Sequence, residues 1–126
     1  MIYVLDASAL LAVILNEPGR DVVKRRMPEA VMSTVNLAEV LGRCADKRIP
    51  LEMAETFIRA EQIRVIEFDL SLARQTADLR PATKARGLSL GDRACIALAL
   101  REKATIVTAD RVWSTLDLGC PVELIR

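Results

Sequence analysis

Residues 2–16, IYVLDASALLAVILN, join a short apolar run to a longer one through a single acidic residue. The run Ile2–Leu5 is continuously apolar, as is typical of a strand buried in a parallel sheet. Asp6 ends this run, and Ala7–Asn16 then follows a helical pattern that Pro18 and Gly19 close. The chain therefore opens with a strand and a helix, the unit from which parallel α/β folds are built.

The same alternation continues to the end of the chain. Further strands are predicted at residues 30–32, 64–68, 105–108 and 122–125, and helices at residues 20–27, 35–47, 51–63, about 71–81, 90–103 and 112–116. We expect a three-layer α/β domain with a central parallel sheet of strand order 3-2-1-4-5, flanked by helices and joined by right-handed crossovers. A length of 126 residues predicts a single domain over residues 1–126.

Composition narrows the class of protein. The chain is 52% hydrophobic and only 3% aromatic, which predicts an aliphatic core and some apolar surface covered by a partner. A net charge of +1 argues against a nonspecific DNA coat. Three widely spaced cysteines favour reduced thiols, and no leader or membrane-spanning pattern is visible, so we expect a cytoplasmic protein.

The chain contains no histidine. Imidazole acid–base catalysis, Ser-His triads and histidine-ligated zinc are therefore excluded by composition. Any hydrolytic chemistry must use carboxylates, hydroxyls, Lys, Arg or a bound metal.

Four acidic residues are placed where a doubly wound sheet binds ligands. Asp6 and Asp110 follow the first and fourth strands, which are neighbours in the expected order, and Glu39 and Asp92 lie in the first turns of helices that begin at the same edge. Crowded carboxylates repel one another and need a cation, and oxygen ligands without His or thiolate favour Mg²⁺ or Mn²⁺. The pattern thus predicts a metal site.

Each acid also has a simpler interpretation. Asp6, Asp92 and Asp110 are well placed to cap the helices that follow them, and Ser89 with Asp92 resembles a capping box. Glu39 caps nothing, but a solvated surface glutamate is common. Only the joint placement of the four favours a functional site.

The sequence closely resembles PIN-domain ribonucleases, in particular VapC-type toxins of type II toxin-antitoxin modules. The resemblance covers the chain end to end and is carried by four blocks: Val4-Leu5-Asp6-Ala7-Ser8-Ala9, Ser33-Thr34-Val35-Asn36-Leu37-Ala38-Glu39, Leu88-Ser89-Leu90-Gly91-Asp92 with Ile96-Ala97, and Thr108-Ala109-Asp110-Arg111 with Trp113. It implies that Asp6, Glu39, Asp92 and Asp110 bind metal and catalyse, supported by Ser8, Asn36 and Thr108. It also implies Mg²⁺- or Mn²⁺-dependent RNA cleavage that arrests growth, a homodimer, and a cognate VapB-type antitoxin that inserts a segment, often with an Arg, into the acidic pocket.

The resulting hypothesis is hydrolysis by a metal-activated water, which would leave a 5′-phosphate and a 3′-hydroxyl. Basic side chains would contact the RNA backbone, with Arg93 and Arg111 as the candidates nearest the acids and Lys84 with Arg86 as a further pair. Trp113 could stack on a base, although a single Trp in an aromatic-poor chain more often fills the core.

Alternative functions stay open at this point. A phosphoacceptor receiver domain has a similar length and pattern, but its acid pair after the first strand and its Lys after the last are missing. A haloacid-dehalogenase-type phosphatase needs a second Asp where this chain has Ser8. A catalytically inactive PIN module that binds nucleic acid or protein is the third alternative.

Overall fold

Five short strands form the centre of the computed structural model, which describes residues 1–126. They are β1 (Tyr3–Leu5), β2 (Ala30–Ser33), β3 (Arg64–Ile66), β4 (Thr105–Thr108) and β5 (Val122–Leu124). All neighbouring strands pair in parallel, in the order β3-β2-β1-β4-β5. The predicted strand order is therefore confirmed.

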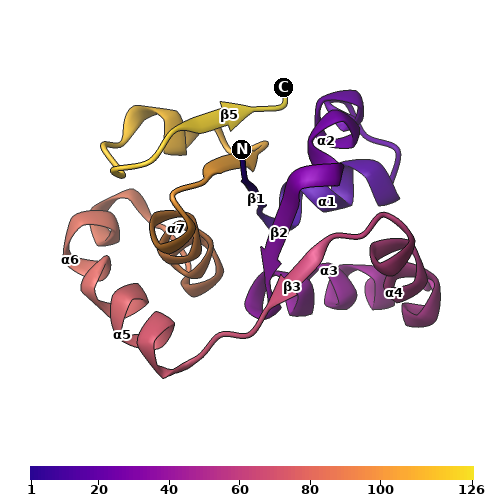
Figure 1. Cartoon of the computed structure of the whole chain (residues 1–126), viewed down its shortest axis with the longest axis horizontal. Helices are drawn as coiled ribbons and strands as arrows, with labels where there is room; N and C mark the ends of the chain where they lie inside the picture. Colours follow the sequence, from indigo (N-terminus) through magenta and orange to yellow (C-terminus); the bar gives the residue numbers. More distant parts are fainter.

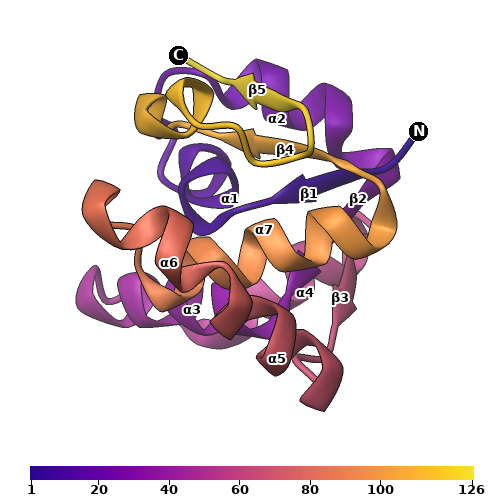
Figure 2. The same ribbon diagram turned by 90° about the vertical axis from the view of Figure 1, so that its left-hand side faces the viewer.

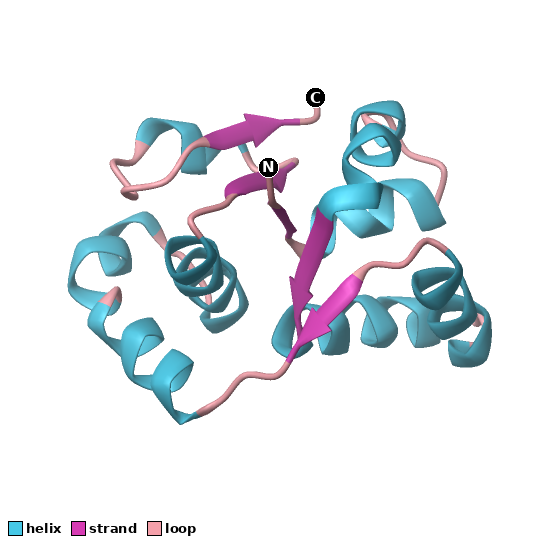
Figure 3. Cartoon of the chain, viewed as in Figure 1, coloured by secondary structure: helices cyan, strands magenta, loops and turns pink.

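Helices cover both faces of this sheet (Figures 1 and 3). One side carries α1 (Ala7–Ile14), α2 (Arg20–Arg26), α3 (Thr34–Asp46) and α4 (Leu51–Ala60), and the other carries α5 (Leu70–Asp78), α6 (Arg80–Thr83) and α7 (Leu90–Glu102). Three 3₁₀ helices complete the chain: η1 (Met27–Glu29), η2 (Lys84–Arg86) and η3 (Arg111–Thr115). The arrangement is the predicted three-layer α/β domain.

Side chains that alternate along the strands divide the core in two. Tyr3 and Leu5 of β1 pack into a cluster with the first four helices, whereas Val4 between them packs into the cluster around α7. Successive side chains of a strand point to opposite faces of the sheet, so a strand covered on both sides must be apolar throughout. This is the physical basis of the unbroken apolar run that opens the sequence.

The helix α7 lies deepest of all the helices. Gly91 and the run Arg93–Ala99 are buried, as its all-round apolar pattern predicts. Its first turn meets α3, and its flank packs along α5. The start of α7 is therefore held in place from two directions.

Several helix ends differ from the predicted ones. The helix predicted at 51–63 ends at Ala60, and the one predicted at 20–27 is followed by a 3₁₀ turn that passes through Pro28. Proline is accepted there because the first turn of a helix has no partner for its missing N–H group. None of the helices is both long and apolar enough to cross a bilayer.

Candidate active site

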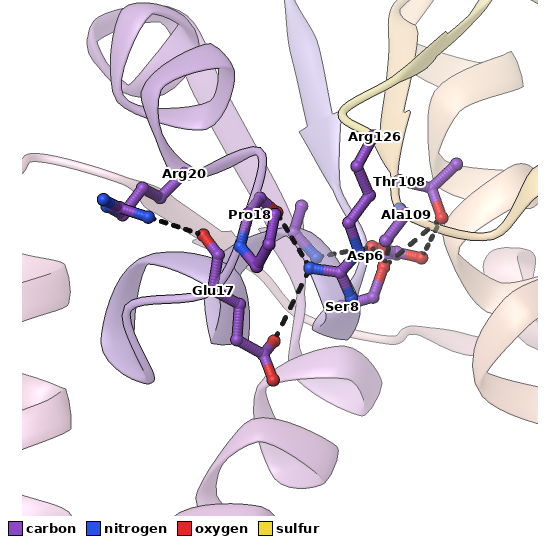
Figure 4. A network of polar contacts seen from close by, with 9 residues as sticks. Asp6, Ser8, Glu17, Pro18, Arg20, Thr108, Ala109 and Arg126 are labelled. Atoms are coloured by element: carbon purple, nitrogen blue, oxygen red, sulfur yellow. Dashed lines mark hydrogen bonds and ion pairs between the residues drawn. The ribbon is translucent and has the colours of Figure 1, made fainter.

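Asp6 lies at the carboxyl end of β1 and is the N-cap of α1 (Figure 4). Its Oδ1 accepts hydrogen bonds from the Ala9 backbone N–H at 2.9 Å and from the Ser8 hydroxyl at 2.7 Å. Its Oδ2 accepts from the Thr108 hydroxyl at 2.5 Å. The carboxylate is thus fixed by groups from two neighbouring strand ends.

Burial raises the pKa of Asp6 from 3.8 to about 6. The hydrogen bonds from Thr108, Ser8 and Ala9 work in the opposite direction, and the negative charge of Asp92 adds to the increase. An acid whose ionised form is disfavoured to this degree is one that a nearby cation would stabilise.

Two hydroxyls tie the end of β4 to the start of α1. The Ser8 oxygen accepts from the Ala109 backbone N–H at 2.9 Å, and the Thr108 oxygen accepts from the Asp110 backbone N–H at 3.0 Å. Ser8 and Thr108, the polar residues predicted as support, each bond to the Asp6 carboxylate and to the backbone of residues 109–110.

The side chain of Asp110 itself is exposed and caps η3, because its Oδ1 accepts from the Val112 backbone N–H at 3.0 Å. Asp92 behaves similarly at the start of α7. Its Oδ2 accepts from the Ser89 backbone N–H at 2.9 Å, and its own N–H donates to the Ser89 hydroxyl at 3.2 Å. The capping box expected from the sequence is formed.

Glu39 reaches the same place from α3. The Asn36 amide donates to Glu39 Oε2 at 3.2 Å and to the Gly91 carbonyl at 3.0 Å, which links α3 to the first turn of α7. A Cβ atom on Gly91 would lie 2.6 Å from the Glu39 Cδ, so the absence of a side chain there makes room for the carboxylate. Asn36, predicted as support, is buried and holds Glu39.

The buried thiol of Cys95 lies within electrostatic range of three of the acids. Burial raises the pKa of Cys95 well above its usual value, and the charges of Asp6, Asp92 and Glu39 all add to that increase. Asp6 follows β1, Asp92 lies in α7 and Glu39 lies in α3, and the charge of each reaches this sulfur. Asp110 is linked to Asp6 through its backbone N–H, which donates to the Thr108 hydroxyl.

The donor chemistry of the acids and Asn36 suits a hard divalent cation. All are oxygen donors, and the buried Asn36 Oδ1 has no hydrogen-bond partner. No three Cys, Asp or Glu side chains converge closely enough to hold an ion, however. Asp92 and Asp110 are directed to the N–H groups they cap, so both would have to share those contacts with a metal.

The two arginines predicted to contact substrate differ sharply. Arg93 is 7% exposed and donates from its guanidinium to the Thr76 carbonyl of α5 at 3.3 Å. It therefore faces the interior rather than the acids, and the structure corrects that prediction. Arg111 is exposed at the start of η3, directly after Asp110.

Other residues also resolve questions that the sequence left open. Trp113 is fully buried, so it fills the core and cannot stack on a base. The sequence pattern does not identify Gly91 and Cys95 as functional residues, although they are four residues apart on one helix. Residues four apart share a helix face, so Gly91 and Cys95 lie under the same side of the first turns of α7.

Comparison with known proteins identifies the fold. The PIN domain family model matches residues 3–118. No curated protein sequence matches the chain significantly.

Solved structures resemble the chain over its whole length. A DNA-bound VapBC from Salmonella typhimurium superposes with a TM-score of 0.80 at 20% identity, covering 100% of this chain and 99% of the other. FitAcB from Neisseria gonorrhoeae gives 0.74 at 20% identity, covering 98% of each chain. VapBC-5 from Mycobacterium tuberculosis, a member of a toxin-antitoxin family, gives 0.65 at 24% identity, covering 99% of this chain and 98% of the other. At these identities the likeness shows a shared fold.

Proposed function

Because the chain belongs to the PIN domain family, we propose that it is a metal-dependent endoribonuclease with Asp6, Glu39, Asp92 and Asp110 as its catalytic acids. The observation that carries this proposal is a set of hydrogen bonds: Asn36 joins Glu39 to the first turn of α7, which carries Asp92, and Thr108 joins the Asp6 carboxylate to the Asp110 backbone. Carboxylates from separate elements repel one another in the folded protein. A cation bound among them would offset this repulsion.

The residues of the chain have separable tasks in this proposal. Mg²⁺ or Mn²⁺, when bound, would supply Lewis-acid activation of the phosphodiester and of a water. Asp6 would be the fixed ligand, because Ser8, Ala9 and Thr108 restrain it. Asn36 would orient Glu39 over Gly91, and Asp92 and Asp110 would contribute charge from their capping positions.

We further propose that the protein is a toxin restrained by a cognate antitoxin, as the toxin-antitoxin complexes among its structural neighbours suggest. An apolar groove of about 340 Å³ between α1 and α4 supports a bound partner. It is lined only by hydrophobic residues: Val13, Ile14, Ile49, Met53, Ala54 and Phe57. A homodimer, implied by the resemblance to VapC-type toxins, is part of the same proposal.

A catalytically inactive binding module is the second candidate. It is favoured by the absence of three converged ligands and by the capping contacts of Asp92 and Asp110, which account for both residues without chemistry. In that case Asp6, Asp92 and Asp110 would stabilise helix starts, Glu39 would be a surface acid, and none would recruit a metal.

One experiment separates the two candidates. The purified protein is incubated with end-labelled cellular RNA in Mg²⁺, in Mn²⁺ and in EDTA, beside the Asp6→Asn variant. The nuclease proposal requires cleavage with either metal, none with EDTA or the variant, and products with 5′-phosphate and 3′-hydroxyl ends. Cleavage that persists in EDTA, or 2′,3′-cyclic phosphate ends, would exclude this mechanism, and no cleavage with either metal would favour the binding module.

A further inference from the structure

Three cations in the segments that adjoin Asp92 and Asp110 in the sequence have no acidic partner. Lys84 and Arg86 belong to η2 and Arg111 to η3, and all three are exposed. None of them is among the ion pairs of the fold, which engage Arg26, Arg74, Arg101 and Arg126. Their charge is therefore available to a ligand.

The two 3₁₀ helices that carry these cations are joined to each other. The Arg86 guanidinium donates to the Thr115 hydroxyl at 2.9 Å, from the end of η2 to the end of η3. This hydrogen bond uses a single donor of a group that has five, so the remaining N–H groups of Arg86 are free. It also positions the guanidinium before any ligand arrives.

Both helices lead directly to the acids. η3 begins at its cap, Asp110, and a five-residue 3₁₀ helix is only about 10 Å long. Ser89, three residues after Arg86, is the cap that holds Asp92. In Figure 2, α6 lies on the same side of the view as the ends of β1 and β4.

We propose that η2 and η3 form a paired phosphate-binding rim, with Lys84, Arg86 and Arg111 holding the RNA backbone next to the acids. This inference rests on the proposed nuclease function for the identity of the ligand. A polyanion can approach four acids only where nearby cations offset the repulsion, and guanidinium groups bind phosphate oxygens in pairs. The scissile phosphate would then lie at the acids, and the adjacent phosphates of the RNA backbone would lie on the rim.

The test measures binding without cleavage. A fluorescein-labelled single-stranded oligoribonucleotide is titrated in EDTA, at several salt concentrations, with the wild type, Arg86→Gln, Arg111→Gln and the double variant. We expect each single variant to bind roughly fivefold more weakly. The salt slope should fall by about 0.7 for each phosphate that the variant no longer neutralises.

Arg59→Gln is the matched control. Arg59 is also an exposed arginine whose side chain donates a hydrogen bond to a threonine hydroxyl, that of Thr56, but it lies on α4. Its replacement should leave both the affinity and the salt slope unchanged. An equal weakening of binding in Arg59→Gln and Arg86→Gln would overturn the rim, because the cations would then act only through net charge.

The remaining outcomes distinguish the rim from the nuclease proposal. If the rim variants bind RNA more weakly but the wild type cleaves no RNA with any metal, the rim stands and the nuclease function fails. If the wild type cleaves RNA while the double variant binds it as tightly as the wild type, the rim fails alone. Displacement of the RNA by poly-glutamate as readily as by unlabelled RNA would also overturn the rim, in favour of an acidic protein ligand.

Discussion

The Thr108 hydroxyl donates a 2.5 Å hydrogen bond to the Asp6 carboxylate, although 102 positions separate the two residues in the sequence. The contact exists because β1 and β4 are neighbours in the sheet and end at the same edge. Thr108 is fully buried and also accepts from the Asp110 backbone N–H, so one hydroxyl links two of the candidate acids. A single side chain thus couples the charge of Asp6 to the position of Asp110.

Replacing Thr108 by valine tests this coupling. Valine has the same shape but no hydroxyl, so Asp6 loses a donor that favours its ionised form. We expect the pKa of Asp6 to rise above about 6, measured by NMR titration of its carboxyl carbon. The free energy of unfolding should fall by about 1–3 kcal/mol, because the Asp110 N–H also loses its acceptor. Thr105→Val, on the same strand, is the control, and equal pKa values of Asp6 in both variants would contradict the coupling.

The raised pKa of Asp6 predicts a specific dependence of stability on pH. The carboxyl ionises near 3.8 in the unfolded chain and near 6 in the folded protein, so between these values the folded state binds more protons. Raising the pH through this window therefore lowers the free energy of unfolding, by about 3 kcal/mol in total, and the loss levels off about one pH unit above the folded pKa. Urea unfolding of the wild type and of Asp6→Asn should show this decline in the wild type only. A decline of the same size in Asp6→Asn would assign it to another group.

Mg²⁺ should reverse that decline if it binds at Asp6. A cation that binds only the folded, ionised form stabilises it by mass action. We expect added Mg²⁺ to raise the melting temperature of the wild type above pH 6 and to leave that of Asp6→Asn unchanged. An equal increase in both proteins would show that the ion binds elsewhere.

The strand order could be predicted, and a candidate site could be proposed, because both depend on patterns that repeat along the chain. The apolar run at Ile2–Leu5 and the later strand runs alternate with helical segments, and acids follow two of them. The helix ends agree less evenly: α3 and α7 end within one residue of the prediction, whereas the helix predicted at 51–63 ends at Ala60. Four helices are followed by residues with left-handed backbone. The residues that adopt left-handed backbone there are Asn16, Arg48, Gln62 and Lys103, where a glycine would be the usual sequence signal.

The site could be predicted only as a set of residues, not as a geometry. The sequence places Asp92 and Arg93 side by side, but neighbours on a helix point about 100° apart, so Asp92 caps the helix start at Ser89 and Arg93 faces α5. Likewise, nothing in the order of residues shows that Asn36 bonds to the Gly91 carbonyl. Contacts between helices that are distant in the sequence depend on how the helices pack, and the local pattern of residues does not predict this packing.

The buried position of Arg93 predicts that its charge is dispensable. It has no acidic partner, and its Nε has no hydrogen-bond acceptor, so the folded protein gains little for the cost of desolvation. Arg93→Met keeps the apolar stem. We expect its free energy of unfolding to be higher than that of the wild type or lower by no more than about 1 kcal/mol, and RNA cleavage to be retained. Arg93→Ala should lose about 2–3 kcal/mol because it leaves a cavity. A large loss of RNA affinity in a stable Arg93→Met would restore the substrate contact predicted from the sequence.

Gly91 gives the sharpest separation of activity from stability. A Cβ atom there would overlap the Glu39 carboxylate, which is the end of a flexible, exposed side chain and can move away. We therefore expect Gly91→Ala to fold with unchanged or slightly higher stability, since alanine is favoured over glycine in a helix by about 1 kcal/mol. RNA cleavage should nevertheless fall on the order of 100-fold, because Glu39 is displaced from Asp92.

Gly42→Ala is the matched control for this variant. Gly42 is also in a helix, α3, and a Cβ atom there meets nothing within 4 Å. The free energy of unfolding of Gly42→Ala, measured in urea, should rise by a similar amount. Its cleavage of the same labelled RNA should equal that of the wild type. If Gly91→Ala cleaves RNA as fast as Gly42→Ala, the place of Glu39 over the first turn of α7 has no catalytic meaning, and Glu39 leaves the set of catalytic acids.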